Sequence, residues 1–147
     1  MAAALTRRQQ TVLVLGLMAT GIGQSLVFAI LAPLGREVHM GELQITSIIA
    51  ISALVFGLSS PHWGRFSDRV GRKPVIITGL VGYSLGTLLF TSMFYAGLAG
   101  LVSGGLLYLL VLSSRVGQAA VMSASNPAST AYAADHSSAD QRTKIMA

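Results

Sequence analysis

Short polar segments separate long apolar stretches along this chain. Residues 11–34 contain no charged side chain, and residues 43–63 and 74–95 are equally apolar apart from His62. A bilayer core about 30 Å thick needs roughly 20 apolar residues per spanning helix. Each stretch is therefore predicted to be a transmembrane helix, with Pro61 marking where the second helix loses its regularity.

The first stretch also has the position of a signal peptide, because Arg7 and Arg8 precede it. The apolar region of a signal peptide is only about 7 to 15 residues long and ends at a small-residue cleavage site. Residues 11–34 exceed that length, so a spanning helix is the preferred interpretation.

The fourth apolar region, residues 98–134, is too long for one straight span, since a helix rises about 1.5 Å per residue. The glycines of residues 97–105 favour a loop, followed by one helix over residues 104–134 that is kinked near Pro127. Two shorter segments meeting near Arg115 are the alternative, but no charged loop separates them.

Lysine and arginine are distributed unequally between alternate polar segments. They gather in residues 1–10, 64–73 and 135–144, whereas the intervening polar segments hold only Arg36. By the positive-inside rule, the cation-rich segments face the cytoplasm. The sequence thus predicts a multi-pass protein of the cell (inner) membrane with a cytoplasmic N-terminus, in which residues 145–147 begin a fifth helix.

Composition agrees with this assignment, because 52% of the residues are hydrophobic and only 10% are charged, against about 25% in a soluble domain. The net charge of +5 could indicate a nucleic-acid partner, but membrane topology explains it, and the basic segment lacks an aromatic platform. The absence of cysteine excludes disulfides and Cys-ligated zinc. The three histidines lack metal-ligand spacing, so no metal, cofactor or enzymatic activity is expected.

Glycines also recur within the apolar stretches, with Gly82 and Gly86 four residues apart. In lipid, such spacing lets two helix backbones approach closely. Tight packing between helices is the preferred interpretation, and a cavity lined by glycine is the alternative.

Residues 64–73, here called the signature segment, carry the most specific pattern in the sequence. They closely resemble the loop G-x-[LF]-[AS]-D-[RK]-x-G-R-[KR] of the major facilitator superfamily. The specified positions are Gly64, Phe66, Ser67, Asp68, Arg69, Gly71, Arg72 and Lys73. The glycines permit tight turns, and Asp68 precedes Arg72 by the four residues that allow a local ion pair. The resemblance implies an all-α membrane protein, part of the N-terminal six-helix bundle of a twelve-helix transporter.

Arg115 and Gln118 resemble the fourth-helix motif of the same superfamily, R-x-x-x-G with a frequent Gln, although Ala119 stands where the family usually has Gly. An arginine within the membrane is expensive, so Arg115 is expected to face the bundle interior or a watery cavity. Snorkelling to the membrane interface is the alternative. Gln118 is a candidate substrate contact.

The passage from Ala131 to Arg142 is similar to the end of helix four in the drug-exporter branch of the superfamily. In that family the signature Asp and the Arg after it form a charge relay with an acid at the cytoplasmic end of helix four. The resemblance implies that Asp68, Arg72 and Asp135 act as a conformational switch rather than as substrate contacts.

All five acids lie in polar segments or at helix ends, so none is expected at mid-membrane depth. If transport is proton-driven, the proton carrier must lie outside this segment. Gln24, in the middle of the first apolar stretch, is a candidate substrate contact, and a polar contact between helices is an equally good reading.

The resemblance implies transport of a small molecule by alternating access, with protons as a candidate coupling ion and efflux as the expected direction. Twelve helices need roughly 240 residues before any loop is counted, so the 147 residues are expected to be the N-terminal part of a transporter whose C-terminal part completes it. The alternative is a self-contained four-helix membrane protein, acting as a small oligomeric pump or as a structural or assembly subunit. That alternative leaves the signature segment unexplained.

Overall fold

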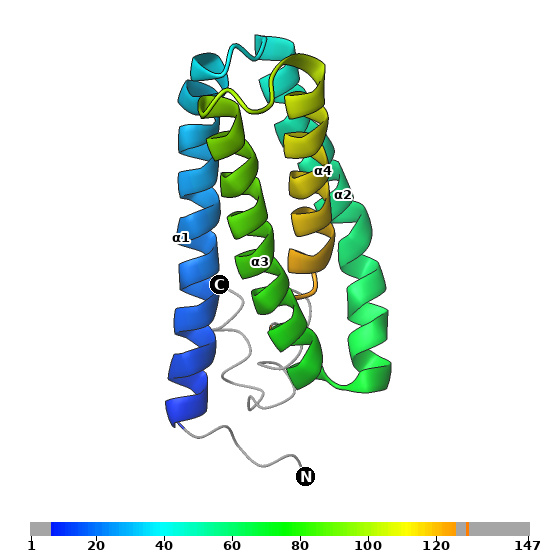
Figure 1. The fold of residues 1–147 in the computed structure, drawn as a ribbon. Helices are drawn as coiled ribbons and strands as arrows, with labels where there is room; N and C mark the ends of the chain where they lie inside the picture. Colours follow the sequence, from blue (N-terminus) through cyan, green and yellow to red (C-terminus); the bar gives the residue numbers. More distant parts are fainter. Residues whose placement is uncertain (1–6, 126–128, 130–147) are drawn as a thin grey trace.

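The computed structural model describes residues 7–125 and residue 129, and this part of the chain contains helices and no strand. Four helices follow one another: α1 (Arg7–Glu37), α2 (Glu42–Val70), α3 (Arg72–Leu98) and α4 (Gly104–Met122). They run up and down alternately, so the start of α1 and the α2–α3 turn share one end of the bundle (Figure 1). The α1–α2 and α3–α4 turns share the other end.

All four helices are long and apolar enough to cross a membrane, as the sequence predicts. Large apolar side chains are exposed along the bundle, including Leu15 and Ile22 of α1 and Leu85 and Leu88 of α3. Lipid tails are the environment in which such side chains can stay uncovered at no cost.

Helix α2 extends further than the hydropathy pattern predicts. It passes through Pro61 and ends at Val70, so most of the signature segment is helical rather than a loop. Only Gly71 separates α2 from α3, which begins at Arg72. Gly71 has φ 106° and ψ 153°, a backbone conformation that is essentially restricted to glycine.

Helix α2 continues past Pro61, and polar side chains beyond this proline bond back to carbonyls of their own helix. His62 Nδ1 lies 2.9 Å from the Leu58 carbonyl oxygen, and Ser67 Oγ donates to the Gly64 carbonyl at 2.8 Å. A helix of 29 residues rises about 43 Å, whereas the hydrocarbon core is about 30 Å thick. The fall in hydropathy after residue 63 therefore predicts where the chain leaves the apolar layer, not where the helix ends.

Helix α4 begins at Gly104, as expected, and runs without interruption through Arg115. Two short segments meeting at Arg115 are therefore excluded. The helix ends at Met122, where the carbonyl of Ala120 accepts hydrogen bonds from Ser123 Oγ (2.8 Å) and from Trp63 Nε1 of α2 (2.6 Å). These side chains take over a carbonyl that would otherwise continue the helical ladder.

Several expected features lie outside the described residues. They are the kink near Pro127, the polar segment 135–144 and the helix start at residues 145–147. The prediction of one helix over residues 104–134 is wrong, because α4 ends at Met122 and residues 123–124 form a turn.

The main hydrophobic core lies toward the end of the bundle that holds the α1–α2 and α3–α4 turns. Leu31, Ile48 and Val111 are fully buried there, and Phe90 packs edge-to-face on Phe94 with ring centroids 5.0 Å apart. Helix α4 makes most of its contacts with α3 and α2 and few with α1. A space between α1 and α4 is thereby left toward the middle of the bundle.

Helices α3 and α4 meet along a glycine seam, formed by Gly79, Gly82 and Gly86 of α3. A Cβ atom at Gly86 would lie 2.6 Å from the Cβ of Gln118, and one at Gly79 would lie 2.7 Å from the Ser125 amide nitrogen. Both distances are shorter than real Cβ contacts. The prediction of tight helix packing at Gly82 and Gly86 is confirmed.

Candidate functional site

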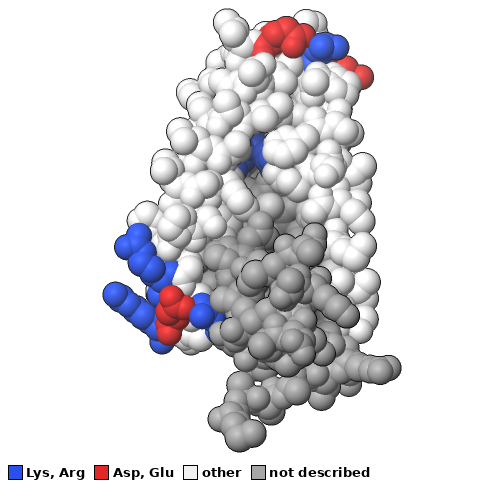
Figure 2. Space-filling model, turned by 180° about the vertical axis from the view of Figure 1, so that it is seen from behind, with Lys and Arg blue, Asp and Glu red and all other residues white. Residues whose placement is uncertain are grey.

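Charged side chains gather at the two ends of the bundle, and the face seen in Figure 2 is hollowed between them, with blue atoms in the hollow. A cavity of about 380 Å³ lies between α1, α2 and α4. Its lining includes Thr20, Gln24 and Phe28 of α1, Ser52 and Phe56 of α2, and Arg115 of α4. The cavity therefore combines two aromatic rings with four polar side chains.

Helical periodicity places these groups on common faces. Thr20, Gln24 and Phe28 follow one another at intervals of four residues, and so do Ser52 and Phe56. Residues at this spacing lie one above the other on a helix. Of these five lining residues only Gln24 was a sequence candidate, although the spacing of Thr20 and Phe28 around it could have identified both.

Arg115 is the most deeply buried charged residue in the described part of the chain, with 1% of its surface exposed. Its Nη1 donates to Gln118 Oε1, one turn along α4. Its guanidinium carbon lies 5.4 Å from the ring centroid of Phe28 and 5.5 Å from that of Phe90. Two aromatic faces thus flank the cation, an arrangement that stabilises a charge withdrawn from water.

Two donor groups of Arg115, Nε and Nη2, have no hydrogen-bond partner among the described residues. No ion pair between Arg115 and a carboxylate is found in this part of the chain. Buried donors without partners are costly, so each one calls for a specific explanation such as a bound water, an ion or a functional role.

Gln118 links Arg115 to α3 rather than lining the cavity. Its Nε2 donates to Thr87 Oγ1 at 2.6 Å and to the Tyr83 carbonyl oxygen at 3.2 Å. Its Oε1 accepts from Arg115, and the residue is 3% exposed. The side chain orients the guanidinium. Tyr83 and Thr87 were not sequence candidates, although their spacing of four residues puts them on one face of α3.

Gln24 lines the cavity, and its Oε1 is buried without a partner among the described residues. The hydroxyl groups of Thr20 and Ser52 donate to carbonyls of their own helices, Leu17 at 2.8 Å and Ile48 at 2.6 Å. Their oxygens remain hydrogen-bond acceptors. The residues that line the cavity thus carry acceptors on α1 and α2 and donors on Arg115, with Gln24 Oε1 and the free Arg115 donors buried behind its surface.

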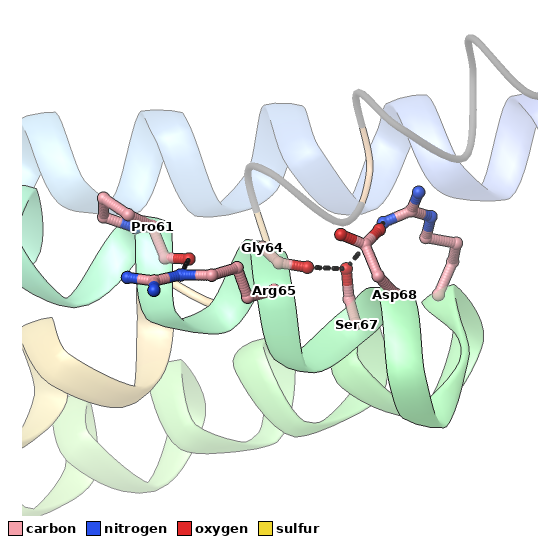
Figure 3. Close-up of polar contacts among 6 residues, drawn as sticks. Pro61, Gly64, Arg65, Ser67 and Asp68 are labelled. Atoms are coloured by element: carbon pink, nitrogen blue, oxygen red, sulfur yellow. Dashed lines mark hydrogen bonds and ion pairs between the residues drawn. The ribbon is translucent and has the colours of Figure 1, made fainter.

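The second candidate site is the α2–α3 turn, where the signature segment forms a compact polar cluster. Arg72 Nη1 lies 2.5 Å from Asp68 Oδ1 and donates to Ser67 Oγ at 2.8 Å, and Ser67 in turn donates to the Gly64 carbonyl (Figure 3). The side chain of Asp68 is 59% exposed, whereas Ser67 is fully buried. An ion pair this exposed contributes little to stability.

The remaining residues of the signature segment surround this cluster. Arg69 and Lys73 are exposed beside the turn, so the turn presents cations to its surroundings. Asp135, expected to complete the charge relay, lies outside the described residues. Within the described residues, no three His, Asp or Glu side chains gather in a way that could hold a metal ion.

Four membrane-length helices, three of them around a cavity whose lining includes a buried arginine, define a polytopic membrane protein. The family model of the Major Facilitator Superfamily matches residues 13–147, and the chain belongs to this superfamily. Members of this superfamily are carriers rather than enzymes.

The chain is similar to curated bacterial resistance proteins. It is 32% identical to Multidrug resistance protein 2 of Bacillus subtilis over 125 residues, which are 85% of the chain and 28% of that protein. It is 33% identical to the class B Tetracycline resistance protein of Escherichia coli over 129 residues, which are 86% of the chain and 28% of that protein. The match thus spans less than a third of either relative's length. No solved structure matches the chain significantly.

Proposed function

We propose that the chain supplies the first four helices of a longer exporter that moves a small molecule across the cell membrane by alternating access. The observation that carries the proposal is the cavity between α1, α2 and α4, whose lining includes Arg115, with its Nε and Nη2 buried and without partners among the described residues. Membership in the superfamily supports transport as the activity, and the short share of each relative that is covered supports a longer protein.

The N-terminus and the α2–α3 turn are proposed to lie in the cytoplasm. The start of α1 lies at the same end of the bundle as the α2–α3 turn, and the signature segment at this end carries Arg65, Arg69, Arg72 and Lys73. The opposite end carries Arg36, which pairs with Glu42 at 2.9 Å. The excess of cations at the first end supports this orientation by the positive-inside rule.

The Asp68–Arg72 pair is proposed to act as a switch between the open and closed arrangements. Only Gly71 separates α2 from α3, and the Asp68–Arg72 pair joins the end of α2 to the start of α3, so a change of partner at Asp68 would act where the two helices meet. The exposure of Asp68 leaves it accessible to a second partner from the rest of the transporter, and Asp135 is the partner proposed within this chain. Bistable contacts of this kind underlie many domain rearrangements.

Transport is proposed to be coupled to protons, and the side chain that carries the proton is proposed to lie outside the described residues. The acids of the described part, Glu37, Glu42 and Asp68, all lie at helix ends, none of them in the cavity wall. A proton carrier inside the membrane needs a group that titrates, and Gln24 and Gln118 do not.

The test is an efflux assay on cells that express the complete reading frame, with tetracycline and a lipophilic cation as probes. Lower accumulation than in cells with the empty vector supports the proposal, as does loss of this difference when the proton gradient is collapsed. Arg115→Ala is expected to abolish efflux while the amount of protein in the membrane changes little. Unchanged accumulation across a broad panel of small molecules would refute the transport function.

A further inference from the structure

The charge balance of the cavity constrains what it can bind. Arg115 keeps its charge at any physiological pH, yet it is 1% exposed and has no carboxylate partner among the described residues. Burying a cation without a counter-charge is costly, the rings of Phe28 and Phe90 offset part of that cost, and an anion that reached Arg115 would offset more of it.

The free donors of Arg115 have the geometry that an anionic oxygen requires. Nη1 is held by Gln118, which is itself anchored on Thr87 and Tyr83 of α3, so the guanidinium plane is fixed. Nε and Nη2 remain without partners. These two nitrogens form one edge of the guanidinium, and this edge matches the two oxygens of a carboxylate.

The rest of the cavity indicates the body of the ligand. Phe28 and Phe56 present aromatic surface, and most of the remaining lining is apolar. The acceptor oxygen of Gln24 is also unpartnered, which suits a ligand that carries a hydrogen-bond donor away from its charge. A volume of about 380 Å³ accommodates a small aromatic molecule.

We infer that the cavity binds the anionic oxygen group of an aromatic organic acid, with the Nε–Nη2 edge of Arg115 as its anchor. This inference rests on the proposed transport function and names the substrate class for it. It differs from a cavity for lipophilic cations, because Arg115 would repel a cation at close range in a medium of low dielectric constant.

The test is equilibrium binding to the complete protein in lipid nanodiscs, with benzoate, benzamide and benzylammonium as probes of similar shape. Charge-assisted, bidentate hydrogen bonds predict that benzoate binds about tenfold or more tightly than benzamide. Benzylammonium should not bind measurably. Equal binding of benzoate and benzamide, or tighter binding of benzylammonium, would overturn the inference.

Substituted variants show which residue is responsible for the preference for benzoate over benzamide. Arg115→Gln should remove the preference for benzoate, whereas Arg36→Gln, which removes an exposed cation at the bundle end, should keep it. Gln24→Glu provides a second test in case Arg115→Gln does not fold, because a carboxylate on the cavity wall would neutralise Arg115 from within. A benzoate preference that survives either cavity substitution in folded protein would place the anion elsewhere and contradict the inference.

Failure of this inference is separable from failure of the proposed function. A protein that exports a neutral or cationic drug but shows no preference for benzoate would retain the transport function and lose only the substrate class. A protein that exports no compound would lose the proposed function, whatever it binds in nanodiscs.

Discussion

The glycine seam between α3 and α4 leads to a prediction about both stability and the cavity. Substituting Gly86→Ala places a Cβ atom 2.6 Å from the Cβ of Gln118 and 3.1 Å from its Cα. Ordinary contacts between carbon atoms are about 3.5–4.0 Å long, so the two helices must separate by about 1 Å. The atoms concerned belong to the start of the Gln118 side chain and its backbone, which a rotamer change cannot move away.

The expected loss of stability follows from two opposing effects. Overpacking a tight interface costs about 1–3 kcal/mol, while replacing glycine by alanine inside a helix stabilises it by about 1 kcal/mol. The matched control is Gly57→Ala in α2, where a Cβ atom would meet nothing within 4 Å. The free energy of unfolding should therefore be lower for Gly86→Ala than for Gly57→Ala by about 1–3 kcal/mol.

Reversible unfolding in mixed detergent micelles measures this difference. Because Gln118 bonds to Thr87 at 2.6 Å and holds Arg115, separation of the helices should also weaken binding in the cavity. If Gly86→Ala stabilises the protein as much as Gly57→Ala does, α3 and α4 do not approach each other this closely at Gly86, and the prediction is refuted.

Three further predictions concern the α2–α3 turn and the orientation of the bundle. Gly71→Ala should destabilise the protein by about 1–3 kcal/mol, because φ 106° strains any side chain, and an unchanged melting temperature would contradict the turn geometry. Asp68→Asn should reduce efflux by the complete protein with unchanged insertion, as measured in vesicles; undiminished efflux would reject the switch. The chain has no cysteine, so a single cysteine introduced into it can report which side of the membrane its position faces. Leu101→Cys should react with an impermeant maleimide in intact cells and Val70→Cys only after lysis, and the opposite pattern would invert the orientation.

Hydropathy predicts the helices of this protein well and their ends poorly. The apolar stretches correspond to α1 to α4, because the bilayer demands both apolarity and a satisfied backbone. The ends differ because a helix satisfies its own backbone groups outside the hydrocarbon as well as inside it, so α2 continues through polar residues to Val70. Loss of hydropathy at residue 64 was therefore no sign of a loop.

The candidate site was only partly accessible from the sequence. The cost of an intramembrane charge predicts that Arg115 is interior, and the structure buries it. Its flanking rings, Phe28 and Phe90, come from two other helices, and no spacing within α4 reveals them. Gln118 was expected to contact substrate, whereas its polar atoms bond to Arg115 and α3, a contact set by helix packing rather than by local pattern.

Access to the cavity from each side of the membrane tests the central claim most directly. Ala53 lines the cavity. The 147 residues contain no cysteine, so Ala53→Cys introduces a single one among them. In the complete transporter, alternating access predicts that an impermeant maleimide labels this position from outside in intact cells and from inside in inverted vesicles, with a transported compound slowing both reactions. Leu58→Cys, on an exposed apolar surface of α2, should stay unlabelled from both sides. Labelling of Ala53→Cys from one side only, under every condition, would contradict the account.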